Sequence, residues 1–71
     1  MGFSIDTFAA NLRAERARKG MSQVELAEAS GINRAAIGFY ENGEQMPGAD
    51  KIFALADALG VTPNELIGWK E

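Results

Sequence analysis

The spacing of the apolar residues narrows the folds open to this chain more than any other feature. Apolar residues recur at helical intervals in one segment after another, as Ile5, Phe8 and Leu12 do near the start, and strand-like alternation is almost absent. Clear start signals separate these segments. Ser22 and Thr62 each stand three residues before a glutamate, which is the pattern of a capping box. The sequence therefore predicts an all-α fold.

Five helices and no sheet are expected, over about residues 5–19, 22–29, 33–42, 49–59 and 62–68. Gly20, Gly43 and Gly60 follow three of these segments, where a glycine can end a helix. With 71 residues the chain can build one small core. Because no linker or repeat divides it, we expect residues 1–71 to form a single domain.

The composition excludes several classes of function. The chain has no Cys and no His, so disulfides, thiolate catalysis and imidazole acid-base chemistry are excluded, and no metal or cofactor is expected. Its carboxylates are spread over solvent-facing helix positions, with no Gly-rich phosphate loop beside them, so we do not expect an enzyme. No apolar run approaches the roughly 20 residues that span a bilayer, and no membrane partner is expected. The lack of Cys suits the cytoplasm.

Residues 23–42 contain two short helical segments whose small and apolar residues favour a close crossing. Ala27 is small enough to let the following helix approach, and Gly31 can adopt the positive φ that turns the chain sharply. Ile37 and Tyr40 are expected to face inward. These are the requirements of a helix-turn-helix, so the chain is expected to be a single helix-turn-helix domain.

The outward side of the third helix is small and mixed in character. A helical wheel groups Arg34, Ala35, Gly38, Phe39 and Asn42 on it, where an ordinary surface would carry Glu and Lys. Small side chains let a helix sink into a groove of DNA. Arg34 can bond guanine O6 and N7, and Phe39 or Ala35 can contact thymine methyl groups.

These motifs resemble a known family. The run "GMSQVELAEASGINRAAIGFYENGE", followed by "ALGVTPNEL", is similar to the lambda-repressor-like, Cro/C1-type (XRE) helix-turn-helix domain over roughly residues 8–67. The resemblance implies a five-helix bundle whose third helix enters the major groove of double-stranded DNA, as a homodimer on a pseudo-palindromic operator. It further implies a transcriptional regulator, with repression as the expected action, in the cytoplasm and nucleoid of a bacterium or phage host.

The resemblance also assigns roles to individual residues. The positions that read bases in this family are occupied by Asn33, Arg34, Ala35 and Phe39. Contacts to the DNA backbone are implied for Arg13, Arg16, Ser22, Gln23, Asn42 and Gly43. The positions that build the motif itself are Ala27, Gly31, Ile37, Tyr40 and Glu41.

Three further expectations concern particular residues. Arg16 and Glu41 match a pair that bridges the first helix to the end of the third in this family, and the wheel places Glu41 at the edge of the inward side as a partly buried carboxylate. Phe39 departs from the family, because polar readers are common at its position. The loop "GEQMPG" departs too, because it lacks the Lys or Arg that many relatives present to phosphate.

The charge keeps a second function open. The net charge is −3, with most basic residues in the first half and an acidic second half. Phe53, Ile67 and Trp69 are candidates for contacts between protomers. An acidic domain with exposed apolar residues could instead be a protein-interaction module, such as an antitoxin or one part of a longer phage-type or bacterial regulator.

Overall fold

The computed structural model describes residues 4–69, which contain five helices and no strand. The helices are α1 (Ile5–Arg18), α2 (Gln23–Ser30), α3 (Arg34–Glu41), α4 (Ala49–Leu59) and α5 (Pro63–Ile67). The expected all-α, five-helix fold is confirmed. The observed helix ends differ from the expected ones by one residue at most, largely because the expected ranges include capping residues. Residues 1–3 and 70–71 of the expected domain lie outside the described residues.

Two capping boxes fix where α2 and α5 begin. The Ser22 hydroxyl accepts a hydrogen bond from the Glu25 N–H at 3.0 Å, and the Glu25 carboxylate accepts one from the Ser22 N–H at 2.8 Å. Thr62 and Glu65 repeat this arrangement at α5. The bonds from the Thr62 N–H and hydroxyl hold the pKa of Glu65 below its ordinary value, because they favour the ionised carboxylate. Local sequence alone therefore sets both helix starts.

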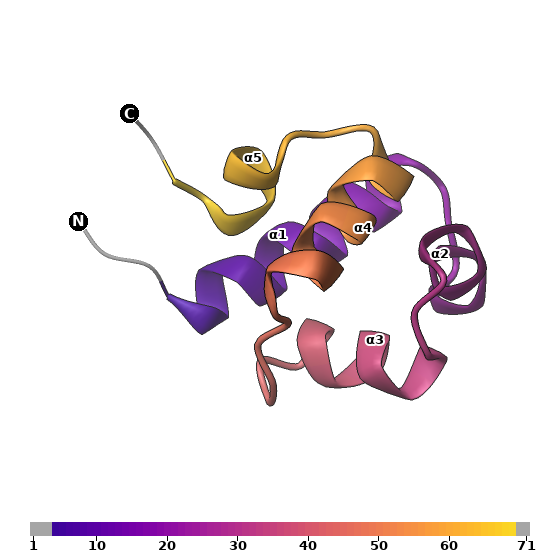
Figure 1. Cartoon of the computed structure of the whole chain (residues 1–71), viewed down its shortest axis with the longest axis horizontal. Coiled ribbons are helices and arrows are strands. Elements are labelled where there is room, and N and C mark those ends of the chain that lie inside the picture. The colour runs from indigo at the N-terminus through magenta and orange to yellow at the C-terminus, as the bar shows by residue number, and fades with distance from the viewer. Residues whose placement is uncertain (1–3, 70–71) are drawn as a thin grey trace.

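The helices form a bundle in which α3 lies along one edge (Figure 1). α1 packs against α3 and α5, α2 packs against α3 and α4, and α4 packs against α5. In Figure 1 α2 is seen nearly end-on while α3 lies across the view, so these two helices cross steeply. This crossing leaves one side of α3 free of the other helices.

The core lies between α1, α3, α4 and α5, with α2 closing one end. Its fully buried side chains include Phe8, Leu12, Leu26, Ile37, Leu55, Leu59 and Leu66. The Tyr40 ring meets Phe8 edge-on, with ring centroids 6.5 Å apart. The inward positions expected for Ile37 and Tyr40 are thus confirmed, and Ala27 packs half-buried against the same cluster.

The turn between α2 and α3 depends on Gly31 and Asn33. Gly31 ends α2 with a φ of 72°, in the left-handed region that favours glycine. The Ile32 N–H then donates to the Ala27 carbonyl at 3.1 Å, and the Asn33 side chain caps α3. Ile32 and Ile37 are both buried, as a hydrophobic staple requires. The turn therefore directs α3 across α2.

Replacing this glycine should strain the turn without causing a steric clash. An added Cβ at Gly31 would meet no atom within 4 Å, so Gly31→Ala should lower the free energy of unfolding through backbone strain alone, by about 1–2 kcal/mol. Gly38→Ala is the matched control, because its added Cβ also meets nothing and its position is helical. That change should stabilise the fold by about 0.5–1 kcal/mol. Urea unfolding of both variants measures the difference, and equal effects would contradict the proposed strain.

Candidate nucleic-acid interface

The outer side of α3 carries most of the residues expected to read bases. Arg34, Ala35 and Phe39 are exposed, whereas Ile37 and Tyr40 on the opposite side are buried. Gly38 lies among the outward residues and is half-buried. The structure therefore brings the predicted reading residues onto one accessible face, although their roles remain predictions.

Hydrogen-bonding groups on this face are few. The Asn33 side-chain oxygen accepts a bond from the Ala35 N–H at 2.7 Å, while the amide NH₂ of Asn33 makes no hydrogen bond within the described residues. The Arg34 side chain makes no ion pair or hydrogen bond within residues 4–69. An exposed guanidinium with free donors at the start of α3 is suited to an acceptor on another molecule.

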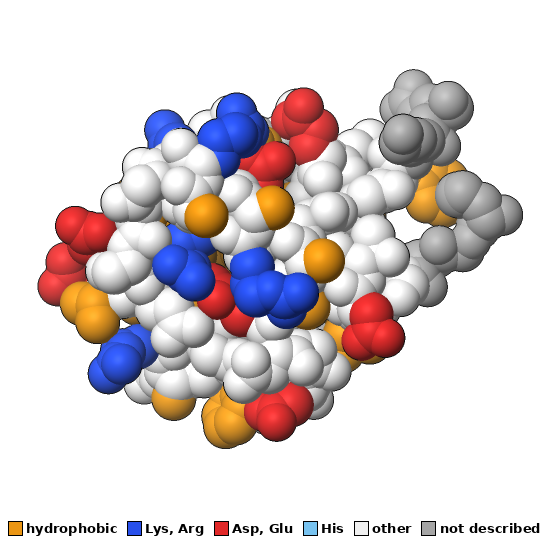
Figure 2. Space-filling view, turned by 180° about the vertical axis from the view of Figure 1, so that it is seen from behind, with side chains coloured by type: hydrophobic (Ala, Val, Ile, Leu, Met, Phe, Trp, Pro, Cys, Tyr) orange, Lys and Arg blue, Asp and Glu red, His pale blue; other side chains and the backbone are white. Residues whose placement is uncertain are grey.

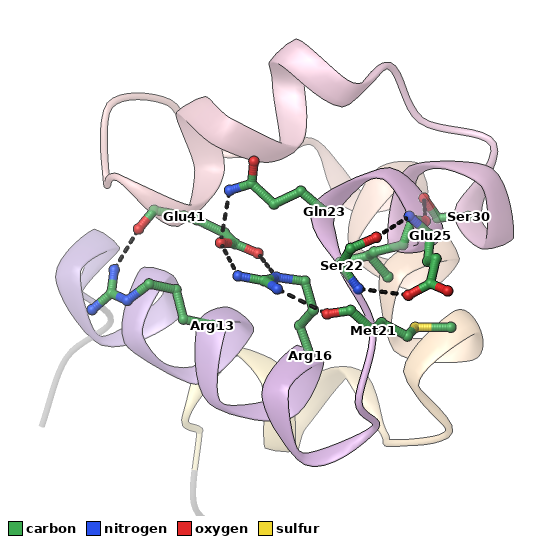
Figure 3. A network of polar contacts seen from close by, with 9 residues as sticks. Arg13, Arg16, Met21, Ser22, Gln23, Glu25, Ser30 and Glu41 are labelled. Atoms are coloured by element: carbon green, nitrogen blue, oxygen red, sulfur yellow. Dashed lines mark hydrogen bonds and ion pairs between the residues drawn. The ribbon is translucent and has the colours of Figure 1, made fainter.

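A buried carboxylate links α3 to the two preceding helices (Figure 3). The Glu41 side chain, at the end of α3, is 2 % exposed. Arg16 Nε donates to its Oε2 at 2.5 Å, and Arg16 Nη2 donates to its Oε1 at 3.0 Å. Gln23 Nε2 donates to the same Oε1 at 3.0 Å. The expected Arg16–Glu41 pair is present, but Glu41 is more deeply buried than the wheel predicts, because side chains from α1 and α2 cover it.

The guanidinium of Arg16 is almost fully engaged inside the protein. Besides its two bonds to Glu41, its Nη1 donates to the Met21 carbonyl at 2.8 Å. The side-chain hydrogen bonds to Glu41 raise the pKa of Arg16, with the negative charge adding to the effect and partial burial opposing it. Its predicted contact with DNA phosphate would therefore depend on the 21 % of the side chain that remains exposed.

Arg13 lies one helical turn from Arg16 and contacts the same end of α3. Its Nη1 donates to the backbone carbonyl of Glu41, one of the carbonyls left unpaired at a helix C-terminus. A cation at this end also interacts favourably with the helix dipole. Arg13 itself is exposed, so its other N–H groups can still reach a phosphate.

The remaining residues expected to contact the DNA backbone differ in exposure and in how freely they could bind a phosphate. Ser22 and Asn42 are exposed, and Gln23 is half-buried with one amide N–H held by Glu41. Gly43 has a φ of 73°, and a Cβ there would lie 3.2 Å from Asp6 Oδ1. Asp6 therefore places a negative charge beside a position expected to meet phosphate. Sequence reasoning missed this, because residues so far apart in the chain carry no local signal of their contact.

Basic side chains gather on the face where α1 lies nearest the viewer in Figure 2. Lys and Arg groups lie near its middle with acidic groups between them, and further Lys and Arg groups lie near its edge together with Asp and Glu groups. α1 contributes Arg13, Arg16 and Arg18 to the basic residues of the chain. This helix therefore brings several basic groups to the surface although the net charge is −3. A polyanion that approached this face would meet these basic groups.

Residues 4–69 contain no enclosed pocket and no group of acidic, Cys or His residues arranged to hold a metal ion. None of the helices in this range is long and apolar enough to cross a membrane.

Comparison with known proteins identifies the family. Residues 12–66 match the HTH_3 family, described as helix-turn-helix, and the chain belongs to it. The chain is similar to YazB of Bacillus subtilis, named as an uncharacterized HTH-type transcriptional regulator, with 38% identity over 78% of this chain and 80% of that protein.

Two solved structures show the same fold. The restriction-modification controller protein C.AhdI from Aeromonas hydrophila is 39% identical and superposes with a TM-score of 0.84, over 87% of this chain and 94% of its own. The P22 c2 repressor, solved in complex with a synthetic operator, is 27% identical with a TM-score of 0.82, over 89% of this chain and 96% of its own. Family and fold are those of DNA-binding transcriptional regulators, not of enzymes.

Removing one partner of the buried pair should destabilise the fold strongly. Arg16→Met leaves the Glu41 carboxylate buried without two of its donors, and we expect the free energy of unfolding to fall by about 3 kcal/mol. Arg18→Met on the same helix is the control, because its pair with Glu15 is exposed and should contribute less than about 1 kcal/mol. The double variant Arg16→Met/Glu41→Leu should recover much of the loss. Urea unfolding tests this, and a double variant no more stable than Arg16→Met would contradict it.

Proposed function

We propose that this chain binds double-stranded DNA sequence-specifically as a homodimer, with α3 in the major groove, and represses transcription from the bound site. The observation that carries the proposal is the outer face of α3, which is accessible and presents Arg34 with no partner within the described residues. The place of action is the cytoplasm and nucleoid of a bacterium or phage host.

The shape of α3 supports entry into the groove. A helix with its side chains is about 10–12 Å across, which the major groove, about 12 Å wide, can admit. Ala35 and Gly38 add little side-chain bulk to the outer face, so the helix backbone can approach the base edges closely. Arg34, in the first turn, can then donate two hydrogen bonds to guanine O6 and N7, while Asn33 has its amide NH₂ free.

Contacts to the DNA backbone would come from three places around α3. The start of α2 offers backbone N–H groups and the Gln23 amide, held in place by Glu41, to a phosphate. Arg13 and the exposed edge of Arg16 add positive charge from α1. Asn42 lies just beyond the C-terminus of α3. These groups would position the protein on the duplex without reading its sequence.

A homodimer would place two copies of α3 about one helical turn of DNA apart. The exposed side of α4 offers a contact, because Phe53 is 62 % exposed and is the most exposed large apolar side chain of the described residues. Trp69, beyond α5, is 48 % exposed, which agrees better with a contact between protomers than with packing inside one.

A second candidate function is supported by the charge around Phe53. Asp50 and Asp57 flank it at the i−3 and i+4 positions of α4 and are exposed with it. An apolar side chain between two carboxylates suits a basic protein partner, as an antitoxin or part of a longer regulator would require. Purification with a stoichiometric basic protein would favour this function over the homodimer.

Selection from a random duplex library tests the main proposal. The wild type should return a two-fold symmetric site, with affinity that falls steeply as salt rises. Arg34→Ala should relax the preference at one G·C pair per half-site by about 1–3 kcal/mol, because the paired hydrogen bonds are lost. Gln23→Ala should weaken binding evenly across sequences. Absence of binding to every duplex, or binding unaffected by salt, would overturn the proposed function.

The role of Phe53 can be tested separately from DNA. Phe53→Ser should convert the dimer to a monomer in light scattering after gel filtration, because it removes the apolar centre of the contact. Val24→Ser is the matched control, because Val24 is also an exposed apolar residue, 43 % exposed, but lies on α2. This substitution should leave the measured molecular mass unchanged. A dimer that survives Phe53→Ser would place the contact between protomers elsewhere.

A further inference from the structure

We infer that Phe39, with Ala35, recognises the C5-methyl group of a pyrimidine in the major groove. The operator half-site would then contain a thymine at this point, and 5-methylcytosine would be accepted in its place. The inference rests on the proposed function, because it requires α3 to lie in the groove.

The first argument is the position of the two apolar side chains. Ala35 and Phe39 are four residues apart on α3, so they lie one above the other on one stripe of the helix. Both are exposed. Phe39 is 42 % exposed, whereas Ile37 and Tyr40, close to it in sequence, are buried. Phe39 therefore does not belong to the core, and its ring remains available to a ligand.

The second argument is the distribution of hydrogen-bonding groups along the outer face. Arg34 and the free NH₂ of Asn33 lie at the start of α3, and Asn42 lies at its end. Between them stand Ala35, Gly38 and Phe39, none of which has a polar side chain. The middle of α3 would therefore contact the bases through apolar groups, and side-chain hydrogen bonds to the bases would come from its two ends.

The chemistry of the groove then selects the ligand. The C5-methyl group of thymine is the apolar group that a base edge presents in the major groove. A guanine, adenine or cytosine edge opposite the Phe39 ring would lose water and gain no hydrogen bond, which is unfavourable. 5-Methylcytosine carries its methyl group at the same ring position as thymine. Methylation of a cytosine at this point should therefore strengthen binding.

Fluorescence anisotropy with modified duplexes tests the inference. On the selected operator, each thymine is replaced in turn by deoxyuridine, which lacks only the methyl group. At one position per half-site we expect about fourfold weaker binding, the size expected when one methyl group leaves an apolar contact. Replacing the T·A pair there by C·G should weaken binding further, and 5-methylcytosine should recover at least part of that loss relative to cytosine.

Variants assign the effect to the side chain. Phe39→Ala should bind the thymine and deoxyuridine duplexes equally at that position and should still fold, because Phe39 is not among the buried core residues. Arg34→Ala is the control, because it should lose the guanine preference and keep the sensitivity to deoxyuridine. Wild-type binding that is indifferent to every deoxyuridine would overturn the inference and leave the proposed function intact. Sensitivity that persists in Phe39→Ala would overturn the role of Phe39, and absence of all DNA binding would overturn the proposed function itself.

Discussion

The position of α3 depends on one buried charge. A carboxylate out of contact with water is unfavourable unless a cation and hydrogen bonds compensate it, and Glu41 receives both from Arg16. Gln23 adds a third donor. Because Arg16 lies on α1 and Gln23 begins α2, the compensation is complete only when three helices meet at the end of α3. The requirement to satisfy this carboxylate therefore fixes α3 in relation to the rest of the bundle.

The same requirement limits the charge left for DNA. Arg16 directs Nε, Nη1 and Nη2 inward, and Arg13 contributes a donor to the end of α3. Asp6 lies against Gly43, where a phosphate is expected. Arg34, the basic residue of α3, is thus left without an ion pair within the described residues. Recognition would then depend more on the fit of α3 to the groove than on bulk attraction.

Local patterns predicted the elements of this fold, because their causes are local. Both capping boxes join residues three apart, and the left-handed turn at Gly31 needs no distant partner. Contacts between helices were less predictable. The family resemblance indicated the Arg16–Glu41 pair, but the depth of burial of Glu41 and the approach of Asp6 to Gly43 depend on how whole helices pack. A helical wheel predicts the direction in which a side chain points, but not which residues of other helices cover it.

A net negative charge can help such a protein to bind in one orientation. On the exposed side of α4, Asp57 opposes an approach that brings this helix against phosphates, while the charge of Asp50 is partly offset by Lys51, whose Nζ lies 3.9 Å from Asp50 Oδ2. Basic residues of α1, with Arg34 on α3, favour the approach that places α3 toward the duplex. A uniformly basic surface would hold DNA in many orientations, most of them unable to read a base. Repulsion from α4 and weak attraction around α3 would together favour the proposed orientation, in which the outer side of α3 meets the base edges.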